Sequence, residues 1–236
     1  MSDVSSPEVI APPTIPPLRE GDRLTREEFE RRYDAMPELK KAELIDGVVY
    51  MGSPVRHRRH SRPHARLIGW LAIYEFATEA VEIGDNASAR LTPLDEPQAD
   101  ATMFILPECG GQVRISRDDY IEQAAELMAE IAGSSKGLDS GKKRDLYAKV
   151  GVREYIVWRT EDEAIDWFIL RDDRYQRLIP GPDGVLRSEV FPGLWLDAHA
   201  MLAGDRKRVS EGARQGIASP EHSAFVQRLS AARSSS

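Results

Sequence analysis

Cysteine is almost absent from this chain, since Cys109 is the only one in 236 residues. A lone cysteine excludes an internal disulfide and a multi-cysteine metal cluster. No apolar run approaches the roughly 20 residues that cross a bilayer. The N-terminal MSDVSSPEVIAPPTIPP lacks the basic flank and apolar core of a signal peptide, so we expect a cytoplasmic protein. The sequence also has no internal repeat, phosphate loop, GxGxxG motif or nucleophile elbow, which removes support for a sugar- or nucleotide-handling enzyme.

Positive charge is outnumbered by negative charge. Lys and Arg number 32 against 39 Asp and Glu, which gives a net charge of −7. Non-specific DNA binding is driven mainly by Lys and Arg that displace counterions from phosphates, so the chain as a whole lacks that attraction. The segment RHRRHSRPHAR, residues 56–66, is the exception, with five arginines and three histidines. It predicts either a local nucleic-acid contact or a solvated basic loop that opens a helix.

Composition and patterning divide the chain into three parts. Hydrophobic residues make up 41% and charged residues 30%, which is typical of a globular domain. Residues 1–20 contain five prolines, so we expect a leader without fixed structure. Residues 21–203 carry the periodic patterns of one folded domain. Residues 204–236 are a polar tail with a short helix around Phe225 to Leu229, and this tail either docks or stays mobile.

Local signals predict most of the elements. Thr25 and Glu28 fit the capping box of a short helix, and Asp46-Gly47 fits the tight turn of a hairpin. Apolar residues at spacings of three and four predict a later helix with one packed face. The elements expected from these signals are a helix over 25–33, a hairpin over 41–52, a helix over 59–76, two short strands over 81–94, a buried strand over 101–106, a helix over 139–150 that stops at Gly151, and strands from Val152 onward.

The segment DDYIEQAAELMAEIAG, residues 118–133, permits two structures. Its apolar residues recur on one helical face and its glutamates recur at spacing four, and Ala, Glu, Leu and Met favour a helix. In that helix Glu130 would be a solvated surface charge. In a strand from Glu126 to Ala132, Glu130 would instead share a face with Met128. The residues taken alone favour the helix.

Lys142 and Lys143 can be distinguished by the helical faces they occupy. Counting three, four and seven residues on from Lys143 reaches Leu146, Tyr147 and Val150, which form an apolar face. The same offsets from Lys142 are mostly polar. Lys143 should therefore point toward the core, where a lysine is costly unless it is paired with acids. The later Trp158, Trp167 and Phe168 are expected to pack in the sheet rather than stack on bases.

A family resemblance joins these segments. ELIDG (Glu43), PQADA (Asp100), AELMAEIAGSS (Glu130) and DSGKKRDLYAKVGVREYIVW (Lys143) resemble the Uma-two family of restriction endonucleases, a branch of the PD-(D/E)XK nuclease superfamily. The resemblance runs from about Leu24 through Leu202. It implies an α/β fold with a restriction-endonuclease-like core, in which helices flank a central mixed β-sheet. It also implies the strand for residues 126–132, because related sequences carry Gly and Pro at the positions of Gln123 and Ala125.

The resemblance further implies a metal-dependent endonuclease that hydrolyses phosphodiester bonds in DNA. Asp100 and Glu130 would hold Mg²⁺ or Mn²⁺ with the carbonyl of Ile131, and Glu43 would complete the acidic set. Lys143 would orient the attacking water or stabilise the developing charge. The superfamily usually places this lysine two residues after the second acid. That position is Ala132 here, so Lys143 would be a substitute from the next helix.

The basic segment and the resemblance together predict contacts to substrate and partners. Arg59 and His64 are the predicted DNA contacts, and His64 matches a histidine common near the start of this helix in the family. Capping of the helix is an alternative role for His64. Family members often pair because cutting both strands needs two sites, so the resemblance is compatible with a homodimer. The acidic net charge and the missing standard lysine support an alternative, a catalytically inactive nuclease fold that acts as a binding or assembly module.

Overall fold

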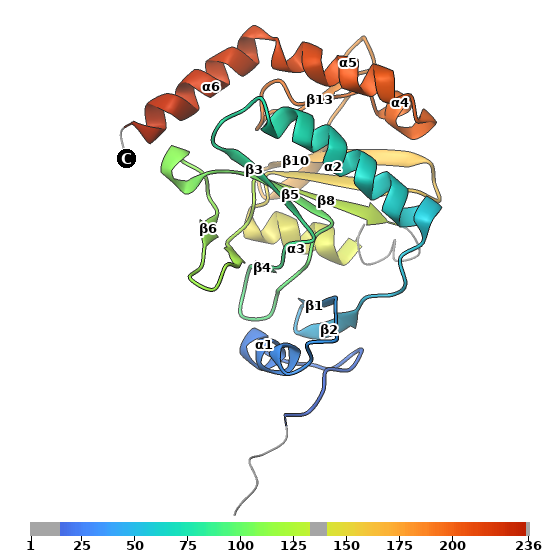
Figure 1. The fold of residues 1–236 in the computed structure, drawn as a ribbon, viewed down its shortest axis with the longest axis vertical. Helices are drawn as coiled ribbons and strands as arrows, with labels where there is room; N and C mark the ends of the chain where they lie inside the picture. The colour runs from blue at the N-terminus through green and yellow to red at the C-terminus, as the bar shows by residue number, and fades with distance from the viewer. Residues whose placement is uncertain (1–14, 133–140, 235–236) are drawn as a thin grey trace, which may run out of the picture.

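The centre of the molecule is a six-stranded mixed sheet with the strand order β11-β10-β9-β8-β5-β3 (Figure 1). The computed structural model describes residues 15–132 and 141–234. The strands are β3 Val81–Asp85, β5 Ala101–Ile105, β8 Leu127–Ala132, β9 Glu154–Arg159, β10 Ala164–Arg171 and β11 Arg174–Arg177. Strands β8 and β9 run parallel, and the other neighbours in this sheet run antiparallel. This arrangement confirms the predicted α/β fold with a mixed central sheet flanked by helices.

Residues 118–132 do not form the helix that the periodicity of this segment favoured. They form β7 Ile121–Glu122 and then β8, as the family resemblance implied. Gln123 between these strands has φ 72, a left-handed conformation that interrupts a right-handed helix. All six residues of β8 are buried, with Leu127 packed on one face of the sheet and Met128 on the other. Burial on both faces explains why the strand prevails over intrinsic helix propensity.

One helix covers each face of the sheet next to β8 (Figure 1). Helix α2 Arg62–Glu75 buries Leu67, Trp70, Leu71 and Tyr74 on the face that includes Leu127. A π-helical turn at His57–Ser61 precedes α2, and Pro63 lies in the first turn of α2. Helix α3 Lys143–Val150 covers the other face and ends at Gly151, which has φ 87. Residue 139, where the sequence placed the start of α3, lies outside the described residues.

A small N-terminal unit packs beside this core. Thr25 caps helix α1 Arg26–Asp34, and its hydroxyl accepts a hydrogen bond from the amide of Glu28. Strands β1 Ala42–Ile45 and β2 Val48–Met51 form the predicted hairpin, with positive φ at both Asp46 and Gly47 as a type I′ turn requires. Leu18 is buried in the same unit, so the leader expected over residues 1–20 ends before it. Residues 1–14 lie outside the described part of the chain.

The C-terminal segment docks on the helical layer, which is one of the two outcomes expected for it, and it contains more helix than the single short one expected. Helices α4 Ala198–Ala203, α5 Arg206–Ile217 and α6 Pro220–Arg233 cross the top of the molecule (Figure 1). Val209, Ala213, Phe225 and Leu229 are buried in the core beneath them. The remaining elements are β4 Ala89–Arg90, β6 Arg114–Ile115, β12 Leu186–Arg187, β13 Trp195–Leu196 and a 3-10 turn at Pro107–Cys109. Among the described residues, we find no helix with the length and apolarity that a membrane span requires.

Candidate active site

Two buried acids meet where β5 and β8 lie side by side. Ala101 of β5 pairs with Ala129 of β8, so extending this antiparallel register by one residue brings Asp100 opposite Glu130. Each acid is 2% exposed. The amide of Ile131 donates a hydrogen bond of 2.8 Å to Asp100 Oδ2. The structure therefore brings Asp100, Glu130 and Ile131 together, although 30 residues separate the two acids.

Lys143 connects this pair to a third acid, Glu43. Its Nζ lies 2.9 Å from Glu130 Oε1 and 2.7 Å from Glu43 Oε1. Lys143 is 1% exposed, so its predicted orientation toward the core is confirmed. One turn further along α3, the hydroxyl of Tyr147 donates to Glu130 Oε1 at 2.8 Å. Glu43 also accepts a hydrogen bond from the amide of Gln98 at 2.7 Å, which fixes its carboxylate beside the lysine.

Two residues that we did not predict contact Asp100. His60 Nε2 lies 3.2 and 3.1 Å from the two carboxylate oxygens, and Lys41 Nζ lies 3.5 Å from Oδ1. Burial alone would raise the pKa of Asp100. The hydrogen bond from His60, the charge of Lys41 and the amide of Ile131 outweigh burial and hold this pKa well below its usual range. Asp100 is therefore an ionised carboxylate inside the protein.

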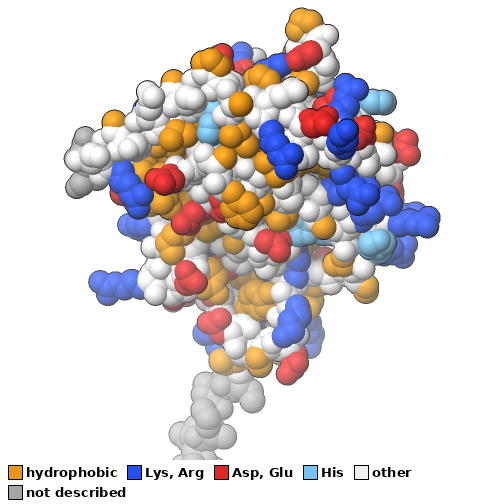
Figure 2. All heavy atoms as spheres, turned by 45° about the horizontal axis from the view of Figure 1, so that its top comes forward, with side chains coloured by type: hydrophobic (Ala, Val, Ile, Leu, Met, Phe, Trp, Pro, Cys, Tyr) orange, Lys and Arg blue, Asp and Glu red, His pale blue; other side chains and the backbone are white. Residues whose placement is uncertain are grey.

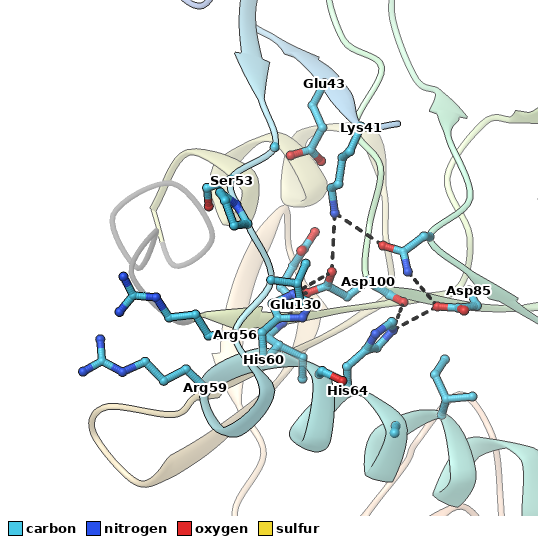
Figure 3. Close-up of a pocket in the computed structure, with 18 of the residues that line it drawn as sticks. Lys41, Glu43, Ser53, Arg56, Arg59, His60, His64, Asp85, Asp100 and Glu130 are labelled. Carbon is cyan, nitrogen blue, oxygen red and sulfur yellow. Dashed lines mark hydrogen bonds and ion pairs between the residues drawn. The ribbon is translucent and has the colours of Figure 1, made fainter. Parts of the chain in front are cut away.

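The two residues predicted to contact DNA occupy different positions. His64 Nε2 lies 2.7 Å from the backbone carbonyl of Asp100 and 3.0 Å from Asp85 Oδ1, so the imidazole fixes the Asp100 backbone. Arg59 is exposed and forms an ion pair of 3.0 Å with Glu161. In Figure 3 its side chain extends away from Asp100. The structure thus brings His64 into the acidic site and leaves Arg59 at its rim.

The acids open into a cavity of about 1270 Å³ between the hairpin and the start of α2. Its lining includes Lys41, Glu43, Arg56, Arg59, His60, His64, Asp100, Glu130 and Ile131. Arg58 and Arg62, from the same basic segment, are exposed nearby in the chain. Lys, Arg and His side chains gather at one edge of the molecule in Figure 2, on the side where Figure 1 places the start of α2. The cavity therefore has an acidic floor and a basic rim.

The donor chemistry of this floor fits a hard divalent cation. Within residues 15–132 and 141–234, no group of three His, Cys, Asp or Glu side chains is arranged to hold a metal ion. Mg²⁺ does not require such a group, because it keeps several waters and commonly binds one or two carboxylates together with phosphate oxygens. Asp100 and Glu130 both line the cavity and offer those carboxylates. Two protein carboxylates with room for water and phosphate are therefore compatible with Mg²⁺ or Mn²⁺.

The unpredicted members of the site carry weak sequence signals. His60 lies four residues before His64 in the basic segment, a spacing that places two side chains on one helical face. Lys41 lies two residues before Glu43, a spacing that places two side chains on one face of a strand. Tyr147 follows Lys143 by four residues on the apolar face of α3. Each spacing is compatible with an ordinary surface or core position. The spacings therefore identify these residues as part of the site only once the positions of Asp100 and Glu130 are known.

Comparisons with known proteins agree with this arrangement. A sequence model of the Uma2 family, described as "Putative restriction endonuclease", matches residues 26–199. Among solved structures, the chain is similar to the crystal structure of "a putative nuclease belonging to DUF820" from Anabaena variabilis ATCC 29413. The two are 13% identical with a TM-score of 0.54, and the match covers 76% of this chain and 99% of the other. At this identity the likeness shows the fold. No curated protein matches the chain.

Proposed function

The chain belongs to the Uma2 family of restriction endonuclease-like proteins, and from this premise we propose that it is a metal-dependent endonuclease that hydrolyses phosphodiester bonds in DNA. Family membership supports the broader nuclease-like role. The finer proposal is carried by one observation, the buried acids Glu43, Asp100 and Glu130 with Lys143 beside an open cavity. Burying this many charges is costly, and a site for a cation and a phosphate explains why the chain does so.

Asp100 and Glu130 are the proposed ligands of Mg²⁺ or Mn²⁺, and the backbone carbonyl of Ile131 is a third candidate donor. When bound, the ion would polarise the phosphodiester and lower the pKa of a water molecule. The protein's own contribution is to keep both carboxylates in position. The Ile131 amide and His60 orient Asp100, while Lys143 and Tyr147 orient Glu130. Such supporting contacts keep ligands within the narrow geometry that the chemistry needs.

The basic rim supports nucleic acid as the substrate. The chain is acidic overall, so attraction to DNA must come from a local concentration of positive charge. Arg56 and Arg59 line the cavity, and the exposed Arg58 and Arg62 extend the same basic segment. Phosphate contacts of this kind position a duplex without reading its sequence. We propose that these arginines hold the backbone that flanks the scissile phosphate, with His64 acting through the Asp100 backbone.

A cleavage assay tests this function. Purified protein is incubated with supercoiled plasmid and Mg²⁺ or Mn²⁺, and nicked and linear products are measured over time. We expect the double variant Asp100→Asn, Glu130→Gln to lose more than about a thousandfold in rate, because charge stabilisation at a phosphoryl centre is a large catalytic term. Addition of a chelator should abolish cleavage by the wild type.

Glu126→Gln is the matched control for this assay. Glu126 is fully buried, precedes β8 and accepts hydrogen bonds from the amides of Ile105 and Gln112, away from the cavity lining. This variant should cut at the wild-type rate. Equal cleavage by the double variant would assign the activity to a contaminant or to another site. DNA binding without cleavage would instead favour the catalytically inactive binding module.

A further inference from the structure

Two lysines, Lys41 and Lys143, contact the acids of the site, and they differ in how exposed they are. Lys143 lies beneath the acids with a side chain that is 2% exposed, whereas the Lys41 side chain is 30% exposed. Lys41 is the lysine among the described residues that line the cavity, and Lys143 is not part of that lining. A phosphate that enters the cavity therefore meets Lys41 first.

Hydrogen-bond lengths show how firmly each ammonium is held. Lys143 Nζ lies 2.7 and 2.9 Å from two carboxylate oxygens, which is the range of strong charge-assisted bonds. Lys41 Nζ lies 3.5 Å from Asp100 Oδ1 and 3.4 Å from Asn86 Oδ1, distances beyond the usual range for N–H···O bonds. Lys143 would have to abandon two buried carboxylates to reach a phosphate, whereas the contacts of Lys41 to Asp100 and Asn86 are long and more easily given up.

Local structure directs the Lys41 side chain toward the acids. Lys41 immediately precedes β1 and lies two residues before Glu43. Side chains at this spacing point to the same face of a strand, and both of these line the cavity. Gly52 lies against its stem, and a Cβ at Gly52 would come within 3.0 Å of Lys41 Cβ. The absence of a side chain at Gly52 leaves the space that the lysine stem occupies. Figure 3 shows the lysine extending from the hairpin toward Asp100.

We propose that Lys41 is the lysine that contacts the scissile phosphate, and that Lys143 is a positioning residue that holds Glu43 and Glu130. This inference rests on the proposed nuclease function. It changes the role predicted for Lys143, because the positive charge that stabilises the reacting phosphate comes from the N-terminal hairpin instead of from α3. The compact ammonium of Lys41 would bind a non-bridging phosphate oxygen beside Asp100, where negative charge increases during the reaction.

Lysine footprinting tests the contact without requiring cleavage. The protein is acetylated with a water-soluble amine reagent, with and without a short DNA duplex in Ca²⁺, and modification of each lysine is measured by mass spectrometry. We expect the duplex to reduce modification of Lys41 at least fivefold. The neighbouring Lys40 is exposed and outside the cavity lining, so its modification should stay the same. Lys143 should resist the reagent in both states because it is buried.

A kinetic comparison adds a second readout. Lys41→Gln should lower the cleavage rate at saturating DNA by about a hundredfold, which is typical for loss of one donor to a developing charge. Lys40→Gln should cut like the wild type, and Lys41→Arg should recover part of the rate because it keeps the charge. Both glutamine variants should unfold at the wild-type temperature, since Asp100 keeps its bonds from His60 and Ile131.

The outcomes separate this inference from the proposed function. Protection of Lys41 supports the inference even if the wild type cuts nothing, and in that case only the catalytic proposal fails. Equal modification of Lys41 with and without DNA overturns the inference. So does wild-type cleavage by Lys41→Gln, even if the protein is an active nuclease. Protection of Lys41 together with loss of cleavage in Lys41→Gln supports both.

Discussion

Buried acids lie near both ends of the parallel strands β8 and β9, and the two ends differ in what surrounds those acids. At the N-terminal end, Leu127 pairs with Glu154, and Glu126 lies one residue before. At the C-terminal end, Glu130 faces Asp100 and Lys143. We call the first the sealed end and the second the open end, because residues of the second line the cavity.

The sealed end satisfies its acids with neutral donors. Glu154 accepts hydrogen bonds from the amides of Glu189 and Val190, the hydroxyl of Ser188 and the indole of Trp167. Burial outweighs these donors and raises the pKa of Glu154 to about 7. Burial also raises the pKa of Glu126. Through the hydrogen bonds that they accept, Glu126 and Glu154 connect neighbouring segments of the chain to the sheet.

The open end places the ammonium groups of lysines beside its acids. His60 and Lys41 contact Asp100, whose pKa is lowered despite burial, and Lys143 bridges the other two carboxylates. Cationic partners keep a carboxylate ionised and able to bind a metal, whereas the neutral donors around Glu154 do not offset burial, which favours the protonated form. The comparison teaches that burial alone does not identify a functional acid in this protein. A functional acid is identified by the charge of its partners and by its access to the cavity.

Replacing the central cation should give the largest effect on stability. Lys143→Met leaves two carboxylates buried without their counter-charge, so we expect a loss of about 3–5 kcal/mol in the free energy of unfolding. Urea denaturation measures this loss. Adding Glu43→Gln and Glu130→Gln to the same variant should recover part of it. Lys142→Met, at the exposed neighbouring position, should change stability by less than about 0.5 kcal/mol. A similar small loss for Lys143→Met would show that the open end is not the ion cluster described above.

The contribution of Glu154, at the sealed end, to the free energy of unfolding should depend on pH. Glu154 holds its proton more tightly in the folded protein than in the unfolded chain, where its pKa is near 4.5. The resulting stabilisation is complete below that value and is lost as pH rises through about 7. Glu154→Gln removes this titration while keeping an oxygen acceptor. From pH 4 to pH 8 the variant should therefore gain up to about 3 kcal/mol relative to the wild type, measured by urea unfolding. A constant difference across this range would show that Glu154 does not titrate as described.

A pair of tyrosines should give the smallest effects. The hydroxyl of Tyr147 donates to Glu130 at the open end, and that of Tyr175 donates to the Val152 carbonyl near the sealed end. Tyr147→Phe should cost about 1.5–3 kcal/mol because its acceptor is a carboxylate in an ion pair, and Tyr175→Phe about 1 kcal/mol. Thermal unfolding and plasmid cleavage should both be measured. Only Tyr147→Phe should also slow cleavage, and equal slowing by both variants would contradict a specific role for the open end.

Sequence reasoning was accurate where a signal is local. The Thr25 cap and the Asp46-Gly47 turn depend on a few adjacent residues, and the inward face of Lys143 depends on one helix. Residues 118–133 show the limit of this approach, because their helical period conflicts with burial on both faces of β8. The packing of this segment between two helices decides between a helix and a strand. The residues alone do not show that packing, and the strand was predicted from the family resemblance.

The partners of Asp100 could not be predicted because they depend on distant segments. His60 reaches Asp100 through a π-helical turn, and π-helical turns often occur at functional sites but have no simple sequence pattern. Lys41 lies in a separate hairpin, 59 residues before Asp100 in the chain. The docking of Phe225 and Leu229 in α6 also required a surface on the core that no local pattern shows.

A cation site formed by Asp100 and Glu130 is tested by titrating the protein with Mn²⁺ in the absence of DNA, with free Mn²⁺ followed by electron paramagnetic resonance. We predict that the wild type and Glu126→Gln bind the ion alike. The Asp100→Asn, Glu130→Gln variant should bind it at least tenfold more weakly, because replacing even outer-shell partners of a metal commonly costs about 10–100-fold in affinity. Equal Mn²⁺ affinity in all three proteins would contradict a cation site at the open end of β8 and β9.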